Sequence, residues 1–517
     1  MNTDEHRWAA LPERQADRAG QLTCALDERV PAVHRAYRIC VHLCSSVVLD
    51  FFRPVDIASA VAFRIAVGLL MLAAIARYFA YGWITQLYVT PRIFFPYPGL
   101  EWIVPLPGAA MYALFVMLGV LAVCVAIGLW YRASVALLCL GFTYVHLLDR
   151  TNYLNHYYLL SLLSGLMIFL PLHGAASLDA WRRPVLRSAT VPAWVVWLLR
   201  FQLGVVYVFG AVAKLNADWL LRGQPLRIWL GANVDLPLLG PWLEAPWAAY
   251  VCSYAGLAFD ASIVPLLLWR RTRTAAFIAV LIFHAFTALL FPIGMFPWIM
   301  IALTPIFFPP DWPRRWLGGR RCAAPSACST RSSPHAIDWL VAAGIAAYAL
   351  VQIALPLRHL LYAGDLYWSE SGMRFSWQIM VMEKYGRATF RVTDPRSGAT
   401  WTINPGDSLT PLQVRMMATQ PDMIRSFAEY LAAEFRARGY DRVEVHGDVY
   451  VSLNGRPHQR LVDPHVDLAH LGERGGPPRW IVPLRDRQPA SSRAGTVVAH
   501  HPTRGESASP REQGGES

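Results

Sequence analysis

Lysine is rare in this sequence, and one lysine stands where it could act as a base. The chain has 517 residues and 47 lysine or arginine residues, of which only Lys214 and Lys384 are lysines. Lys214 directly follows the apolar run 206–213. Burial in an apolar site favours the neutral amine of a lysine, which can accept a proton, whereas arginine keeps its proton. Lys214 is therefore a candidate general base, and a lysine that anchors the end of a membrane helix is the alternative.

Two further side chains share a helical face with this lysine. Arg200, Tyr207 and Lys214 are spaced by seven residues, which is nearly two turns of an α-helix. Hydrogen bonding between helices is the ordinary role of such side chains in a membrane, and it is the role expected of Arg200 and Tyr207.

Other ionisable residues lie inside or at the ends of apolar runs, and such residues are functional candidates in a membrane protein. His156, preceded by Asn155, begins one of these runs, and a packed hydrogen-bonding histidine is the structural alternative. Asp260 and His284 lie on neighbouring runs, where they could pair, and a structural role is favoured over a catalytic role for such a pair. The remaining members of this group are Arg64 and His146.

Several classes of chemistry have no support in the sequence. It has no Ser-His-Asp order, no glycine-rich phosphate loop, no Cys-x-x-Cys and no His-Glu-x-x-His. The eight cysteines show neither metal-ligand spacing nor a disulfide framework, so no metal is expected. The net charge of +12 is spread between apolar runs rather than gathered in one patch, so nucleic acid is not expected as a partner.

The composition is that of an integral membrane protein. Hydrophobic residues make up 55% of the chain and charged residues 16%, whereas soluble domains have roughly 25% charged residues. A bilayer core about 30 Å thick requires roughly 20 apolar residues per helix. The predicted transmembrane helices are nine runs, at 57–80, 108–129, 132–148, 155–172, 192–213, 246–269, 274–291, 293–308 and 336–356. Pro292, Gly294 and Pro297 interrupt the pair at 274–308, which could form a broken or re-entrant helix.

The basic residues of the loops predict the orientation. With the N-terminus in the cytoplasm, the short inner loops hold twelve arginines and the short outer loops hold five basic residues. This bias favours a cytoplasmic N-terminus and an extracytoplasmic C-terminus, because inner loops are enriched in Lys and Arg. A multi-pass protein of a bacterial cytoplasmic membrane is the predicted localisation, with membrane lipid around the helices.

The composition changes near residue 357. Alternating polar and apolar residues predict strands at 375–382, 389–393 and 443–453, and 411–438 has helical spacing with a break at Pro421 and Asp422. Asn454-Gly455 is typical of a turn. The predicted fold is thus a multi-pass all-α membrane bundle, residues 51–356, followed by an extracytoplasmic α+β domain, residues 357–485. Residues 1–50 are predicted as a cytoplasmic segment and 486–517 as a disordered tail.

The sequence around Lys214 resembles the signature of vitamin K-dependent γ-carboxylases, which belong to a wider group with a horizontally transferred transmembrane domain. The resemblance rests first on Lys214-Leu215-Asn216-Ala217-Asp218-Trp219 with Gly223. It extends over about 50–470. The other matching stretches are Phe283-His284, Phe291-Pro292-Ile293-Gly294-Met295-Phe296, Phe308-Pro309-Pro310-Asp311-Trp312-Pro313, Arg374-Phe375-Ser376-Trp377-Gln378-Ile379-Met380-Val381, Val451-Ser452-Leu453-Asn454-Gly455-Arg456 and Val462-Asp463-Pro464-His465-Val466-Asp467.

The resemblance implies an activity. Lys214, as a neutral amine, would deprotonate reduced vitamin K (phylloquinol or menaquinol), which then reacts with O2. The oxygenated product is a base that removes a γ-proton from a glutamate side chain. CO2 adds to the carbanion to give γ-carboxyglutamate, and vitamin K leaves as the 2,3-epoxide. The partner would be a glutamate-containing protein or peptide.

The resemblance also implies roles for other residues. His156 would assist Lys214 in catalysis by hydrogen bonding to oxygen intermediates or protonating them. The expected cofactor-binding residues are Asn155, Tyr207, His284 and Met295. Ser376 and Trp377 match the region that binds the glutamate substrate. Animal carboxylases have a histidine near the position of Met382, and departures near the glutamate site leave open a vitamin K epoxidase without carboxylation. A non-enzymatic quinone- or lipid-binding protein on the same scaffold is a separate alternative.

Overall fold

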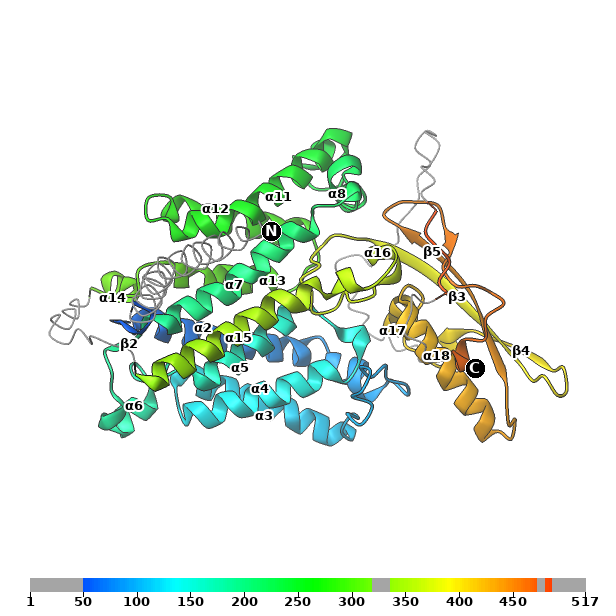
Figure 1. The fold of residues 1–517 in the computed structure, drawn as a ribbon, viewed down its shortest axis with the longest axis horizontal. Coiled ribbons are helices and arrows are strands. Elements are labelled where there is room, and N and C mark those ends of the chain that lie inside the picture. The colour runs from blue at the N-terminus through cyan, green and yellow to red at the C-terminus, as the bar shows by residue number, and fades with distance from the viewer. Residues whose placement is uncertain (1–49, 319–334, 472–478, 486–517) are drawn as a thin grey trace, which may run out of the picture.

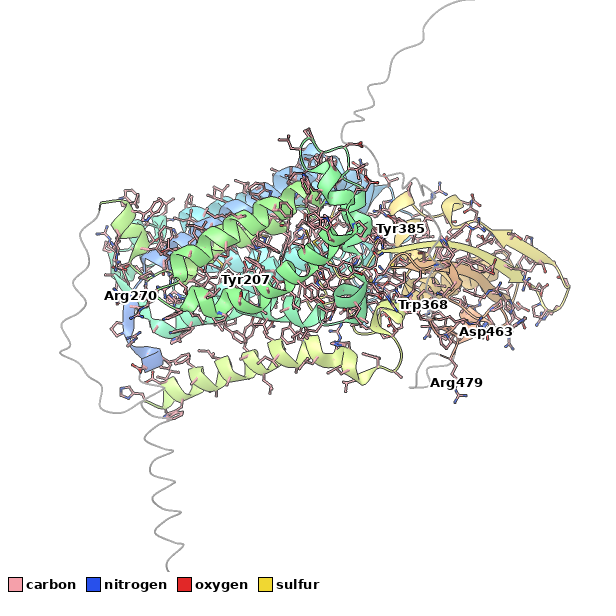
Figure 2. All side chains as sticks on the ribbon, turned by 90° about the horizontal axis from the view of Figure 1, so that it is seen from above. Tyr207, Arg270, Trp368, Tyr385, Asp463 and Arg479 are labelled. Carbon is pink, nitrogen blue, oxygen red and sulfur yellow. The ribbon has the colours of Figure 1, made fainter. Side chains whose placement is uncertain are left out.

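The computed structural model describes residues 50–318, 335–471 and 479–485, and it divides into a long helical region and a C-terminal domain at one end of it (Figure 1). The predictions for residues 1–50 and 486–517 fall almost entirely outside the described residues. Figure 2 shows the same division, with Tyr207 among the helices, Asp463 in the C-terminal domain and Arg270 at the end of the helical region away from that domain.

The helical region is built from long helices joined by turns, loops and shorter helices. Its long helices are α2 (Ala58–Ala80), α3 (Gly108–Ile127), α4 (Tyr131–Leu147), α5 (Asn155–Phe169), α7 (Ala193–Ala213), α11 (Pro246–Leu268), α12 (Arg273–Leu290) and α15 (Ala336–Leu357). Its shorter helices are α6 (Leu178–Arg182), α8 (Ala217–Arg222), α9 (Leu226–Gly231), α10 (Gly240–Glu244), α13 (Phe296–Leu303) and α14 (Trp312–Trp316). Strands β1 (Pro54–Asp56) and β2 (Thr190–Pro192) pair antiparallel next to the starts of α2 and α7.

Six helices among the described residues are long and apolar enough to cross a membrane. They are α2, α3, α7, α11, α12 and the stretch Ala336–Leu361 that contains α15. The other three predicted ranges contain shorter helices: α4 has 17 residues, α5 has 15 and α13 has 8. The predicted interruption near Pro292 is confirmed, because α12 ends at Leu290 and α13 begins at Phe296.

Two arginines of the helical region have structural roles. The buried guanidinium of Arg64 donates hydrogen bonds to the carbonyl oxygens of Leu172, Ala126 and Ala176, which lie at the ends of other helices and in their turns. Arg200 donates in the same way to the carbonyl oxygens of Ile306 and Phe308. Both side chains satisfy backbone groups that helix ends leave free, as expected for Arg200.

The C-terminal domain is an antiparallel sheet with helices packed on it. Its strand order is β4 (Thr400–Ile403), β3 (Lys384–Thr393), β5 (Glu444–Leu453) and β6 (Gln459–Arg460). Helices α17 (Pro411–Met417) and α18 (Pro421–Ala437) pack on the sheet through apolar residues such as Phe427, and α16 (Leu366–Ser369) precedes it. The predicted strands at 389–393 and 443–453, the helix break before Pro421 and the turn at Asn454-Gly455 are confirmed.

The predicted strand at 375–382 is wrong. This segment contains no strand, and Phe375, Trp377 and Met380 have positive φ angles of 61°, 57° and 54°. Its alternation has another cause, because the apolar side chains pass from one core to another along the segment. Trp377 packs in the core of the helical region, while Met382 packs against that of the C-terminal domain. The segment 375–382 is therefore a seam between the two parts of the molecule.

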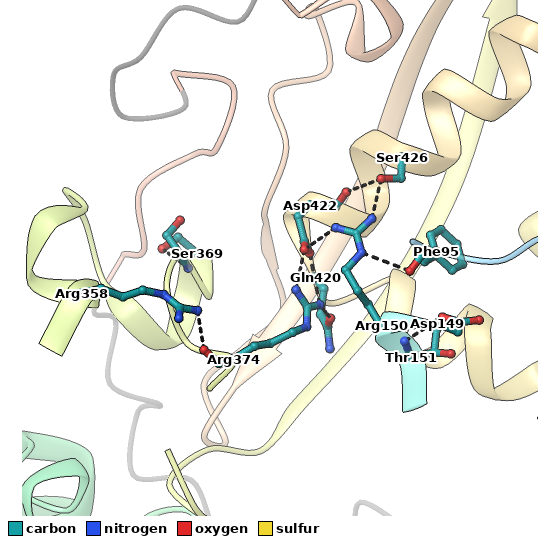
Figure 3. A network of polar contacts seen from close by, with 11 residues as sticks. Phe95, Asp149, Arg150, Thr151, Arg358, Ser369, Arg374, Gln420, Asp422 and Ser426 are labelled. Atoms are coloured by element: carbon teal, nitrogen blue, oxygen red, sulfur yellow. Dashed lines mark hydrogen bonds and ion pairs between the residues drawn. The ribbon is translucent and has the colours of Figure 1, made fainter. Parts of the chain in front are cut away.

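An ion-pair network also holds the C-terminal domain to the helices (Figure 3). Asp422, at the start of α18, accepts hydrogen bonds at 2.6 Å from Arg150, beside α5, and from Arg374, beside the seam. Arg150 also donates to the Ser426 hydroxyl at 2.7 Å. Residues far apart in the sequence thus fix the domain at the end of the bundle where α5 begins.

Candidate functional site

The segment Lys214–Trp219 forms the turn between α7 and α8, and each polar residue in it has a distinct task. Asn216 caps α8, because its Oδ1 accepts the Trp219 backbone N–H at 2.9 Å. Asp218 points toward the C-terminal domain, where it meets Arg456. Gly223 ends α8 with a φ of 61°, a left-handed conformation that glycine adopts without strain. The turn fixes the positions of Lys214 and Trp219.

Lys214 is buried and paired with a carboxylate. Its Nζ lies 2.7 Å from Oδ2 of Asp260 on α11, and the two side chains are 7% and 11% exposed. The Nζ also donates to the Gly210 carbonyl at 3.2 Å and lies 5.2 Å from the centre of the Trp219 ring. Glycines at 210 and 256 leave room for the pair, since a Cβ at Gly210 would lie 3.2 Å from the same Asp260 oxygen.

The predicted pair of Asp260 with His284 is wrong. His284, on α12, is hydrogen-bonded to the Tyr207 hydroxyl through Nε2 at 3.1 Å. The rings of Phe259, Phe283 and Phe296 lie within about 6 Å of the His284 ring. Among the described residues, nothing hydrogen-bonds to the buried Nδ1 of His284. Helix packing thus separates two polar pairs, Lys214 with Asp260 and Tyr207 with His284.

His156 lies beside the break between α12 and α13. The histidine is 6% exposed, and a Cβ built on Gly294 would lie 3.6 Å from its Cε1 and 3.8 Å from Nη1 of Arg77. Gly294 has a φ of 63°, a left-handed conformation that favours glycine, so this turn requires glycine for its conformation. Met295, which directly follows Gly294 in the chain, is 5% exposed. The predicted residues His156 and Met295 are therefore brought together.

Arg77 is a residue that the sequence prediction missed. No ion pair joins its guanidinium to a carboxylate in the part of the chain that the structure describes. It lies 5.7 Å from the Tyr81 ring centre and 5.2 Å from that of Trp83. The sequence did contain a signal for Arg77, because this arginine lies in the last turn of an apolar helix and is followed by two aromatic residues.

The seam carries the predicted substrate-binding residues. Trp377 is fully buried and its ring lies 4.9 Å from that of Tyr158 on α5. Its indole N–H has no hydrogen-bond partner among the described residues. Ser376 donates to the Met373 carbonyl, so its hydroxyl has a structural contact. Strained backbone and an unsatisfied buried donor together are typical of functional sites.

Two contacts connect the seam region to the bundle. The Tyr153 hydroxyl donates to Oδ1 of Asn155 at 3.0 Å and accepts the backbone N–H of Phe375 at 2.8 Å. The Tyr367 hydroxyl donates to the Ala213 carbonyl, next to Lys214, at 2.9 Å. Asn155 is thus linked to the seam.

Two family models match the chain, one over most of the helical region and one over α15 and the C-terminal domain. Residues 52–312 match the HTTM domain, and residues 338–487 match the lumenal domain of vitamin K-dependent gamma-carboxylase. The chain belongs to the vitamin K-dependent gamma-carboxylase family. No solved structure matches it. The expectation drawn from the Lys214–Trp219 segment is therefore confirmed at the level of the family.

The carboxylase family implies reduced vitamin K as a cofactor, and the residues present fit such a group. A planar aromatic diol with an apolar tail requires aromatic surroundings and a few polar atoms for its two oxygens. The aromatic rings around His284 and its unsatisfied Nδ1 meet both requirements. Tyr207 on α7 and Lys214 directly after α7 add a hydroxyl and an amine. The residues that would hold the group are Tyr207, His284, Asn155 and Met295.

Proposed function

We propose that this protein is a vitamin K-dependent γ-carboxylase that converts peptidyl glutamate to γ-carboxyglutamate and reduced vitamin K to its 2,3-epoxide. The observation that carries the proposal is the position of Lys214. Its amine is buried in the helical region, beside aromatic rings and polar pairs, in a chain of the carboxylase family. A site from which water is excluded protects a carbanion from protonation and strengthens the interactions of charged groups.

Each residue has a separate role in this proposal. Lys214 accepts a proton from a hydroxyl of the cofactor, and Tyr207 and His284 orient the ring. His156 donates a hydrogen bond or a proton to an oxygen. When bound, reduced vitamin K supplies, by reaction with O2, the base that removes the glutamate γ-proton, and CO2 is the co-substrate. Trp377 lies on the side of the glutamate peptide, and its N–H, which has no hydrogen-bond partner in the described part of the chain, suits a carboxylate.

We also propose nine membrane passes with a cytoplasmic N-terminus and an extracytoplasmic C-terminal domain in a bacterial cytoplasmic membrane. Two features support this arrangement. Helix α4 lies beside α3, and α5 lies beside α4, within the bundle although both are short (Figure 1). Arg270, in one of the arginine-rich loops, lies at the end of the bundle away from the C-terminal domain (Figure 2). Positively charged loops favour the cytoplasmic side.

The decisive experiment follows epoxide and fixed carbon together in detergent-solubilised protein. Reduced vitamin K, O2, labelled bicarbonate and a glutamate peptide are supplied to the wild type, Lys214→Arg and Lys384→Arg. We expect both products from the wild type and Lys384→Arg, and neither from Lys214→Arg, because arginine does not release its proton. Lys384 is a matched control, because it is also buried and paired, with Glu370 at 2.8 Å.

The departure at Met382 supports a second candidate function, a vitamin K epoxidase without carboxylation. Met382 packs against the core of the C-terminal domain and has no group that could bind a carboxylate. Epoxide without fixed label, with several glutamate peptides, would favour this candidate. No product from a folded wild-type protein would instead favour a non-enzymatic quinone- or lipid-binding role.

A further inference from the structure

The pairing of Lys214 with Asp260 affects how the lysine can lose its proton and become a neutral amine. An ammonium group held by a carboxylate is not a base. The pair is almost fully buried, so a proton that leaves Lys214 for bulk water must cross an apolar region and leave an uncompensated carboxylate behind. A route that conserves the charge of the pair is required if Lys214 is to act as a neutral amine.

We propose that Asp260 takes and stores the proton of Lys214. The N–H bond of the ammonium breaks, an O–H bond forms on Oδ2 of Asp260, and the electron pair of the N–H bond stays on nitrogen. The ion pair becomes a neutral amine beside a neutral carboxylic acid. The net charge of the pair is zero before and after, and no oxidant or other reactant is needed. Asp260 thus acts through Lys214 and positions it.

The geometry suits this transfer. The two atoms are 2.7 Å apart, which is the length of a strong charge-assisted hydrogen bond. The Gly210 carbonyl, at 3.2 Å from Nζ, holds a second N–H and orients the amine. The aromatic face of Trp219 covers the lysine, and the Trp219 indole is itself fixed by a hydrogen bond to the Ser253 carbonyl at 2.9 Å. The amine therefore has one fixed direction of proton transfer.

A second carboxylate in the same region, Asp218, shows the contacts of a group that stays ionised near neutral pH. Asp218 accepts hydrogen bonds from Arg222, Asn454 and Arg456, with both oxygens engaged. Asp260, in contrast, accepts a side-chain hydrogen bond only from Lys214 among the described residues. A carboxylate with several donors stays ionised, and one with a single donor in an apolar site can become neutral. Asp260 is thus built to receive a proton.

The other titratable groups around the pair are occupied elsewhere. Tyr207 on α7 and His284 on α12 are hydrogen-bonded to each other. On the outer side, Asp218 of α8 binds arginines, and the Tyr367 hydroxyl donates to a backbone carbonyl. Among the described residues none of these groups is hydrogen-bonded to Lys214 or Asp260. The proton can therefore move within the pair without competition from these neighbours.

The inference rests on the proposed function, but its test includes a measurement that does not. The chain has only two lysines, so mass spectrometry can follow the reaction of each amine with a membrane-permeant imidoester. Only a neutral amine reacts. In the wild type the fraction of neutral Lys214 depends on transfer within the pair, so we expect its labelling rate to be flat from pH 6.5 to 8.5. Lys384 provides the internal reference for reagent reactivity.

Asp260→Asn removes the proton store and keeps a side chain of nearly the same size. We expect labelling of Lys214 in this variant to rise about tenfold per pH unit, because the proton must now leave for solvent. Epoxidation at pH 7 should fall at least tenfold and follow the same slope. Asp260→Glu, which keeps the carboxylate, should restore the flat profile, and Asp441→Asn, at an exposed carboxylate of the C-terminal domain, should not change it.

The outcomes separate the two proposals. Wild-type rates and flat profiles in Asp260→Asn, with the fold verified by thermal unfolding, would overturn the role of Asp260. A wild-type protein that forms no epoxide would refute the proposed function, while the labelling profiles would still decide whether Asp260 controls the protonation of Lys214.

Discussion

Asp218 and Arg456 form a two-fold hydrogen-bonded ion pair that joins the helical region to the C-terminal domain. Both carboxylate oxygens accept from the guanidinium at 2.7 Å, and both side chains are 9% exposed. Asn454 adds a third contact to Asp218 at 2.7 Å. The turn that carries Lys214 is thus fixed to the turn after β5. Two stretches of the family signature, more than two hundred residues apart, meet in this contact.

Removal of the Asp218 carboxylate is expected to loosen the domain contact. In Asp218→Asn the buried Arg456 loses its bidentate partner, which costs about 3 kcal/mol or more when one member of a buried pair is removed. Hydrogen exchange in the seam 375–382 should become faster. Arg425→Gln is the control, because Arg425 pairs with Glu429 on an exposed helix face. Unchanged exchange in Asp218→Asn would contradict the role of this contact.

The domain contact is also expected to depend on acid pH. Burial alone would raise the pKa of Asp218, but hydrogen bonds from Arg456 and Asn454 outweigh it and hold the pKa below its usual value. The pKa of Asp422 is lowered in the same way by Arg374 and Arg150, against the effect of burial. A carboxylate with a lowered pKa stabilises the docked state fully at pH values above its pKa in the undocked state, about 3.9. This stabilisation is lost as the pH falls through the pKa of the docked state.

Proteolysis within the seam should therefore stay constant from pH 8 to pH 5 and should increase below about pH 4. The measurement is partial digestion by an acid-tolerant protease over this range, with a small substrate as the control for protease activity. Faster proteolysis at pH 8 than at pH 5 would show that groups other than Asp218 and Asp422 govern the contact.

Two glycines of α7 offer a matched test of the Lys214 pair. An alanine Cβ at position 210 would lie 3.2 Å from the Asp260 carboxylate, whereas at position 204 it would make ordinary contact at 3.6 Å with Val264. Both changes favour helix by up to about 1 kcal/mol. We expect Gly210→Ala to lower epoxidation roughly tenfold, which corresponds to about 1.4 kcal/mol. Gly204→Ala should keep the wild-type rate, and equal rates for both variants would count against the pair.

The indole N–H of Trp377 is expected to contribute to binding of the glutamate peptide. Trp377→Phe keeps a ring against Tyr158 but removes the unpaired donor. A lost hydrogen bond to a charged group costs about 1.5–3 kcal/mol. The KM for the peptide should therefore rise by roughly tenfold or more, while epoxidation measured without peptide should change little. Trp401→Phe, in the C-terminal domain beside Phe435, serves as the control.

Arg77 is expected to support the chemistry at His156. An arginine without a carboxylate partner can stabilise negative charge that develops on an oxygen nearby. Arg77→Gln should reduce the rate of epoxidation by roughly tenfold, about 1.4 kcal/mol. Arg182→Gln is the control, because Arg182 also lies over an aromatic ring, that of Trp130, at 5.9 Å. Equal losses in the two variants would indicate a general effect on folding.

Local patterns in the sequence determined much of the architecture. Apolar runs marked the ranges of the long helices, and alternation marked the strands at 389–393 and 443–453, because both depend on which side chains along one element are buried. The scarcity of lysine singled out Lys214 before any contact was known. The interruption near Gly294 followed from residues that cannot continue a helix.

Only the tertiary structure decided the partners. Asp260 faces Lys214 rather than His284, because pairing depends on how α7, α11 and α12 are rotated and packed, which no local period records. The alternation at 375–382 was misleading for a similar reason. The side chains of a strand alternate between one core and solvent. Those of the seam pack instead in the core of the helical region and against that of the C-terminal domain. Periodicity reports how often a side chain is buried, whereas the fold decides against what it is buried.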